Sequence, residues 1–203
     1  MKQNILIAGV GGQGNLFASA LLAKSAIQRG YQVLATETIG AAQRGGSVVS
    51  HLRVSDQAMH SPLIPDGQAD YLIGFEPVEL LRNINKLRRD GLYILNTHPV
   101  PTISCTMGIE HYPTFHEIVE ALDSMNLHGY AIKATAAADE ISDPMLMNMV
   151  MVGALCAVSE FFELDDIKAI VAEETRKVLV EANIEALEIG ALLIRQAAEK
   201  LPA

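Results

Sequence analysis

The order of apolar and polar residues along the chain predicts strands that alternate with helices. Short apolar runs, several rich in β-branched residues, are typical of strands, and turn-forming residues separate most of them from longer segments with helical spacing. Gly30 is a predicted stop after the first helix, and Pro77 suits the first turn of the second. We expect strands over Asn4–Ala8, Gln32–Glu37, Ser47–Val54, Tyr71–Phe75, Leu92–Asn96, Ile103–Thr106 and Tyr130–Ala134.

Helices are expected between these strands and throughout the last third of the chain. In the first of them, apolar residues recur at helical spacing at Leu16, Ala20, Ala23 and Ile27. The predicted helices are Asn15–Arg29, Val78–Leu87, Phe115–Met125, Pro144–Ser159, Asp165–Val178 and Ala182–Glu199. This order is typical of an α/β fold: a three-layer, Rossmann-like, mainly parallel sheet with helices on both faces, here with a helical C-terminal third. We expect one domain over residues 1–203.

Composition narrows the class of protein. Half of the 203 residues are hydrophobic and only 19% are charged, which excludes a disordered chain. The apolar excess indicates a partner subunit and an oligomer, or alternatively a helix-rich core. The net charge of −9 opposes binding to nucleic acid or to an anionic membrane, because both need clustered Lys and Arg.

The two cysteines, Cys105 and Cys156, are too few for a disulfide framework, so we expect a reducing, cytoplasmic location. They are also too few for a four-iron cluster, which takes four thiolates. No secretion signal is expected at Met1–Ala8, and the apolar run Met145–Val158 is too short to span a bilayer.

A glycine-rich turn joins the first predicted strand to the first helix. It reads Gly9-Val10-Gly11-Gly12-Gln13-Gly14 and fits the pattern G-x-G-x-x-G. Glycines let the backbone approach a ligand, and the free N–H groups of a helix start favour an anion. Glu37 ends the second strand, where a dinucleotide fold places its ribose partner, so a stand-alone NAD(P)-binding protein is one hypothesis. The alternative is a tight turn whose small residues serve packing. The candidate ligand-binding residues here are Gly9, Gly11, Gly12, Gln13 and Gly14.

A second polar block leads into the third strand and contains Gln43, Arg44, Gly45, Gly46 and Ser47. The guanidinium of Arg44 offers a planar fork for a carboxylate or phosphate. The alternative is a local turn in which Arg44 pairs with a nearby acid. An ordinary Rossmann dehydrogenase would have a helix after Glu37, and its absence here counts against that class.

Other catalytic chemistry finds little support in the sequence. None of the six histidines are spaced i, i+4 as in a helical zinc site, so we expect no metal site. No nucleophile elbow or P-loop is present, and we expect no catalytic residue in this chain.

Several segments together resemble a known family. Gly9–Gly14, Gln43–Arg53 and Ser61–Glu76 are similar to the γ subunit or domain of the 2-oxoacid:ferredoxin oxidoreductases, and particularly to the β subunit of the indolepyruvate enzymes. The similarity continues through Asn96–Pro101, Asn148–Leu155 and Asn183–Ala186. One departure is Ala138–Asp143, which lacks the glycine expected before the Asn-containing helix, so no binding role is assigned there.

The resemblance implies a subunit of a complex that decarboxylates a 2-oxoacid oxidatively with coenzyme A and reduces ferredoxin. It implies that thiamine diphosphate and 4Fe–4S clusters sit in a large, α-type partner subunit, and that this chain holds no cofactor alone and is inactive alone. Indolepyruvate or another aryl pyruvate is the expected substrate, with pyruvate, 2-oxoglutarate and ketoisovalerate as alternatives. A non-enzymatic scaffold module is the remaining hypothesis.

Overall fold

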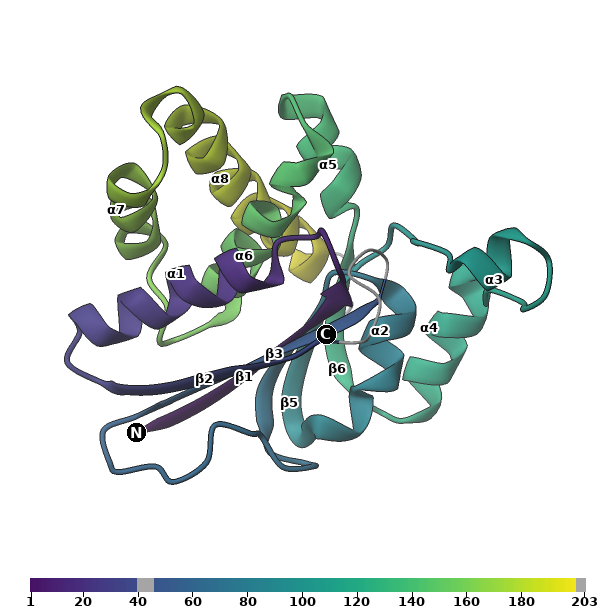
Figure 1. The fold of residues 1–203 in the computed structure, drawn as a ribbon, viewed down its shortest axis with the longest axis horizontal. Coiled ribbons are helices and arrows are strands. Elements are labelled where there is room, and N and C mark those ends of the chain that lie inside the picture. The colour runs from purple at the N-terminus through teal and green to yellow at the C-terminus, as the bar shows by residue number, and fades with distance from the viewer. Residues whose placement is uncertain (40–45, 200–203) are drawn as a thin grey trace.

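Six strands form one mixed sheet in the part of the chain that the structure describes (Figure 1). The structure is a computed structural model and describes residues 1–39 and 46–199. The strands are β1 (Lys2–Val10), β2 (Gln32–Ile39), β3 (Ser47–Ser55), β4 (Ala69–Gly74), β5 (Leu87–Asn96) and β6 (His128–Ile132).

The strand order across the sheet is β2-β3-β1-β4-β5-β6. The pairs β1–β4, β4–β5 and β5–β6 are parallel, whereas β3 runs antiparallel to both β1 and β2. The sheet is therefore mainly parallel, as predicted, and ends in one antiparallel hairpin. Because β2 pairs antiparallel with β3, the two strands need no crossover helix between them, in contrast to the parallel strands of an ordinary Rossmann dehydrogenase.

Helices cover both faces of the sheet, as predicted. Their bounds are α1 (Asn15–Gln28), α2 (Pro77–Arg82), α3 (Ile103–Thr106), α4 (Phe115–Ser124), α5 (Ala134–Ile141), α6 (Met147–Val158), α7 (Leu164–Glu174) and α8 (Lys177–Glu199), with short 3₁₀ turns η1 (Ile84–Lys86) and η2 (Pro144–Leu146). Helices α1 and α5 to α8 share a core with alternate sheet residues such as Ile5 and Ile73. Helices α2 and α4 cover the opposite face, against Leu6 and Leu72. No helix within these described bounds is long and apolar enough to cross a membrane.

Three local predictions are wrong. The helix expected over Asp165–Val178 ends at Glu174, and the last helix begins at Lys177 and not at Ala182. Ile103–Thr106 forms the short helix α3 and not a strand, because Thr102 accepts a hydrogen bond at its Oγ1 from the N–H of Cys105, at 3.2 Å, and so caps a helical turn. The expected long helix after Pro77 ends at Arg82, and β5 already begins at Leu87. The structure also contains α5, which the hydrophobic pattern does not predict.

The C-terminal helices pack at close range. Every residue of α6 from Met147 to Leu155 is buried, which agrees with a helix that is apolar all round. Gly153 of α6 and Gly190 of α8 face the partner helix: a Cβ built on Gly153 would lie 1.9 Å from the carbonyl oxygen of Leu187. The two glycines therefore allow the helix backbones to touch.

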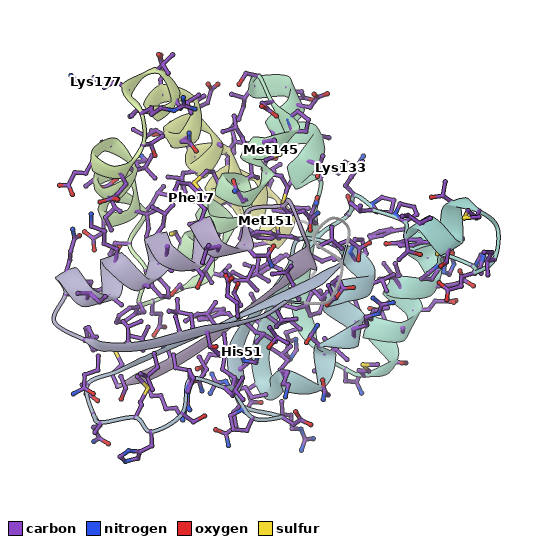
Figure 2. All side chains as sticks on the ribbon, viewed as in Figure 1. Phe17, His51, Lys133, Met145, Met151 and Lys177 are labelled. Atoms are coloured by element: carbon purple, nitrogen blue, oxygen red, sulfur yellow. The ribbon has the colours of Figure 1, made fainter. Side chains whose placement is uncertain are left out.

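His51 lies buried on β3, on the face opposite α1, as Figure 2 shows by comparison with Phe17 and Met151. Its Nδ1 accepts a hydrogen bond from the N–H of Ile64 at 3.1 Å. Burial lowers the pKa of His51 below its ordinary value of 6.5, and the charge of Lys86 acts in the same direction. The folded protein therefore favours the neutral form of the imidazole more strongly than the unfolded chain does.

This burial makes stability depend on pH. Above pH 6.5 His51 is neutral in both states, whereas below it the unfolded chain binds a proton that the folded chain resists. Stability should therefore fall on acidification, by at most about 1.4 kcal/mol per pH unit from this one group. Urea unfolding at pH 7.5 and 5.5 tests this: wild type should lose more stability than His51→Gln, in which the other titrating groups are unchanged. Equal losses would contradict the prediction.

Candidate functional site

The glycine-rich turn lies where the sheet connections change direction. From β1 the chain passes through α1 to β2 at one edge of the sheet, whereas from β4 it passes through α2 on the opposite face to β5. Strands β1 and β4 are parallel neighbours, so their carboxyl ends lie side by side at this position. In open α/β sheets such a switch point is the usual place for a ligand. The predicted turn thus occupies a favourable site in the fold.

The backbone of the turn requires glycine at two positions. Gly12 has φ +105° and Gly14 has φ +81°, both in the left-handed region that favours glycine. Gly14 occupies the N-cap position directly before α1, and no side chain caps that helix start. A Cβ built on Gly12 would meet nothing within 4 Å, so this position faces open space. An uncapped helix start beside an open position can accept an anion.

Gln13 has a structural role within the turn. Its Oε1 accepts a hydrogen bond from the N–H of Val10 at 2.8 Å, and its Nε2 donates to the carbonyl of Phe75 at 3.2 Å. This amide ties the end of β1 to the end of β4. A Cβ on Gly9 would lie 2.7 Å from the same Oε1, so the lack of a side chain at Gly9 makes room for Gln13.

The structure brings the two sequence blocks together. The N–H of Gly11 donates to the carbonyl of Gly46 at 2.9 Å. Ser47 donates from Oγ to Oε2 of Glu79 at 2.5 Å, and the buried Glu79 also pairs with Arg82. Gly46 therefore lies beside the glycine-rich turn, and Ser47 anchors β3 to α2. The other three predicted residues of this block, Gln43, Arg44 and Gly45, lie outside the described residues.

Two cavities open beside the turn. The smaller cavity has a volume of about 140 Å³, and its lining residues are Gly12, Gln13, His98, Thr135, Pro144, Met145 and Met147. The larger, of about 560 Å³, has apolar walls at Phe17, Met145 and Leu179. Met145 borders both, and Figure 2 shows Met145 and Phe17 on the same side of the sheet. A ligand at the turn could extend from one cavity into the other.

The larger cavity also offers polar groups that sequence reasoning does not identify. Asn148 and Asn183 are only 8% and 7% exposed and line it together with Arg176. The Nδ2 of Asn148 lies 2.1 Å from where a Cβ on Gly14 would stand, so this amide closes directly on the turn. Both asparagines fall within the resembling segments, but no spacing in the sequence links them to the distant glycines. The cavity therefore combines amides and a guanidinium with apolar walls, and the carboxylates of Asp143 and Glu174 also line it.

A third cavity, of about 320 Å³, lies between α2 and the segment 100–113. Glu76 caps α2, since its Oε2 accepts the N–H of Glu79 at 2.8 Å, and its Oε1 accepts from the hydroxyl of Tyr112. Burial and the bond to Glu76 raise the pKa of Tyr112, so its hydroxyl stays protonated. These bonds satisfy Glu76, and the cluster anchors the segment to α2.

Glu37 does not reach the glycine-rich turn. Strand β3 lies between β1 and β2, so Glu37 is two strands from β1, about 10 Å away. Its Oε1 accepts a hydrogen bond from Ser50 Oγ at 3.0 Å. A dinucleotide fold needs its acid on the strand next to β1, and this topology therefore disfavours the NAD(P) hypothesis.

The two cysteines lie apart from any cluster of metal-ligating side chains in the described residues. Across residues 1–39 and 46–199, no three His, Cys, Asp or Glu side chains gather so that they could hold a metal ion. Burial raises the pKa of Cys156 to about 12, which keeps its thiol protonated.

Residues 4–193 match the protein family described as pyruvate ferredoxin/flavodoxin oxidoreductase. Over 191 residues the chain is 36% identical to indolepyruvate oxidoreductase subunit IorB of Archaeoglobus fulgidus, a match that covers 94% of each chain. Over 198 residues it is 27% identical to 2-oxoglutarate synthase subunit KorC of Methanothermobacter marburgensis, covering 97% of this chain and 98% of that one.

Solved structures share the fold. The γ subunit of the keto/oxoacid ferredoxin oxidoreductase of Geobacter sulfurreducens matches with a TM-score of 0.71 and 21% identity, over 96% of this chain and 99% of that chain. The 2-oxoglutarate:ferredoxin oxidoreductase of Magnetococcus marinus, solved with 2-oxoglutarate, coenzyme A and succinyl-CoA bound, matches with a TM-score of 0.74 and 18% identity. That match covers 96% of this chain but 31% of the longer one.

Proposed function

Because this chain belongs to the pyruvate ferredoxin/flavodoxin oxidoreductase family, we propose that it is the γ-type subunit of a 2-oxoacid:ferredoxin oxidoreductase that acts on indolepyruvate or another aryl pyruvate. The identity of 36% over nearly the whole chain to an indolepyruvate oxidoreductase subunit carries this proposal. The identity to a 2-oxoglutarate synthase subunit is lower, at 27%. Pyruvate, 2-oxoglutarate and ketoisovalerate are the substrates to test as alternatives.

The reaction divides between subunits. The 2-oxoacid loses its carboxyl group as CO₂, its acyl group forms a thioester with the sulfur of coenzyme A, and the two electrons released reduce ferredoxin. Thiamine diphosphate and the 4Fe–4S clusters that supply this chemistry are assigned to the large α-type subunit, since this chain has only two cysteines. Its own residues take a binding and assembly role, and the complex is proposed to work in the cytoplasm.

We assign coenzyme A to the glycine-rich turn and its cavities. An uncapped helix start favours a phosphate group, and the open position at Gly12 leaves room for it. The larger cavity could then take the flexible arm along Phe17 and Met145, with the guanidinium of Arg176 available for a further phosphate. Gln43, Arg44 and Gly45 join this assignment because they directly precede Gly46, which is bonded to Gly11.

Reconstitution tests the proposed function. Neither this chain nor the large subunit alone should reduce ferredoxin with indolepyruvate and coenzyme A, whereas the two together should. Full activity of the large subunit alone would overturn the proposal. Calorimetric titration of the chain with NADH and NADPH tests the alternative of a stand-alone NAD(P)-binding protein. That alternative predicts saturable binding. A partner that lacks thiamine diphosphate and iron would favour the scaffold hypothesis.

Replacing Arg44 with alanine should lower the activity or assembly of the complex by about tenfold, as expected when a charged hydrogen bond of roughly 1.5 kcal/mol is lost. Folding should change little if Arg44 serves a ligand or a partner. The matched control is Arg195→Ala, which removes an exposed guanidinium near the end of α8. Steady-state rates and melting temperatures of both variants decide the matter: an Arg44→Ala chain that merely unfolds would support the local-turn alternative.

A further inference from the structure

The first helix has a second apolar face. Leu16, Ala20, Ala23 and Ile27, whose spacing predicts α1, do not form its buried side. Leu16 is 65% exposed and Ile27 is 58% exposed. The residues of α1 that pack on the sheet are instead Ala18, Leu21, Leu22 and Ala26. Ala23 is half-buried against the core, but Leu16, Ala20 and Ile27 are exposed, so most of the stripe is apolar without packing inside the described part of the chain.

This stripe borders a groove along the edge of the sheet. The groove has a volume of about 400 Å³ and lies between α1 and Ala35, Thr36 and Glu37 of β2. Lys24 also lines it, and pairs with Glu173 and Glu174 of α7. Glu173 and Glu174 do not line the groove themselves, but they adjoin it through Lys24. Together with Glu37, these three carboxylates outnumber the one ammonium group, so we call the charged surroundings of the groove its acidic rim.

Strand β2 at this groove is an unguarded sheet edge. It pairs with β3 over eight consecutive positions without a bulge, and it is the outermost strand in the described sheet. Natural edge strands usually carry Pro, Lys or a bulge that prevents pairing with another chain. Residues 32–39 contain none of these, and their single charged residue is Glu37. The free backbone groups of β2 are thus available to a further strand.

We propose that the groove between α1 and β2 docks an extended segment of the large subunit, which pairs with β2 and lays apolar side chains on the stripe from Leu16 to Ile27. This inference rests on the proposed function, because that function supplies the partner. The acidic rim calls for Lys or Arg in the docking segment, near Glu37. In the Magnetococcus marinus enzyme the same fold is part of a longer chain, which shows that a unit of this kind can work with other domains attached.

A second copy of this chain fits the groove less well than the large subunit. Each copy carries a net charge of −9, and pairing β2 with its own copy would bring two acidic rims together. A basic segment from a different chain avoids this repulsion.

The test compares two Ile→Glu variants in binding to the purified large subunit. Ile27→Glu places a charge in the groove, whereas Ile109→Glu places the same charge at a residue that is 71% exposed, in the segment after α3. We expect Ile27→Glu to raise the Kd at least about tenfold, because an unpaired charge resists burial, and Ile109→Glu to change it less than about twofold. Both isolated variants should melt within a few degrees of wild type, because both residues are exposed. In hydrogen exchange, the amides of β2 should gain protection only in the complex.

The outcomes separate the two proposals. If the wild-type chain does not bind the large subunit, the proposed function fails. If wild type binds but Ile27→Glu binds equally well, only the groove proposal fails. Equal weakening by both variants also contradicts it, and a dimer of the isolated chain that Ile27→Glu dissociates would assign the groove to a second copy.

Discussion

Replacing Gly153 with alanine should destabilise the protein by about 3 kcal/mol, the upper range for an overpacked core. Alanine favours helices by about 1 kcal/mol over glycine, so the intrinsic effect on α6 has the opposite sign. The added Cβ would lie 1.9 Å from the carbonyl oxygen of Leu187 and 2.7 Å from its carbon. Both atoms belong to backbone, so no rotamer change relieves the contact and the buried helix α6 must move away from α8.

Thermal and urea unfolding measure this effect, with an expected fall in melting temperature of about 6–12 °C for a chain of this size. Gly67→Ala is the control: its φ of +67° imposes backbone strain, but an added Cβ meets nothing within 4 Å. It should cost only about 1–2 kcal/mol. Equal losses from both variants would show that the contact between α6 and α8 does not limit stability.

The close contact between α6 and α8 depends on one glycine from each helix. A Cβ on Gly190 would lie 1.9 Å from the carbonyl oxygen of Val150. Once one alanine has forced α6 and α8 apart, the second has room, so the two costs should sum to more than the cost of the double variant.

The sequence predicts strand and helix positions better than it predicts their arrangement. Apolar runs locate all six strands, because each must be buried on at least one face. The insertion of β3 between β1 and β2 is a tertiary choice that no local pattern records. Helix α5 escapes prediction because its buried residues are Ala134 and Ala138, too small to mark a strong apolar period. In α3, the β-branched residues Ile103 and Thr106 suggest a strand, but the side chain of Thr102 caps the segment and stabilises a helical turn.

In the candidate site, too, the local features are predictable from the sequence and the tertiary contacts are not. The turn from Gly9 to Gly14 is local, and its place between β1 and α1 is as predicted. Asn148 reaches the adjoining cavity from α6, Arg176 from the link before α8, and Asn183 from α8. Only packing of the C-terminal helices over α1 brings them there. Glu37 fails as a partner of the turn for a similar reason, since its distance depends on strand order.

A valine at Gly12 should raise the KM for coenzyme A by about 10- to 100-fold, which corresponds to roughly 1.4–2.8 kcal/mol of lost binding. Gly12 faces open space at the mouth of the smaller cavity, so the new side chain occupies the approach to the uncapped start of α1. The KM for the 2-oxoacid should stay unchanged, because the thiamine diphosphate with which it reacts is assigned to the large subunit. At saturating coenzyme A, kcat should change less than KM.

Gly30→Val separates ligand binding from backbone strain. Gly30 has φ +84°, close to the +105° of Gly12, and an added Cβ meets nothing within 4 Å at either position. Both variants therefore strain a left-handed residue and should lose similar stability, but Gly30 follows the opposite end of α1. A raised KM for coenzyme A in Gly12→Val alone assigns the phosphate to the turn. Equal KM values in the two reconstituted variants would instead leave the turn a packing element and place coenzyme A wholly on the large subunit.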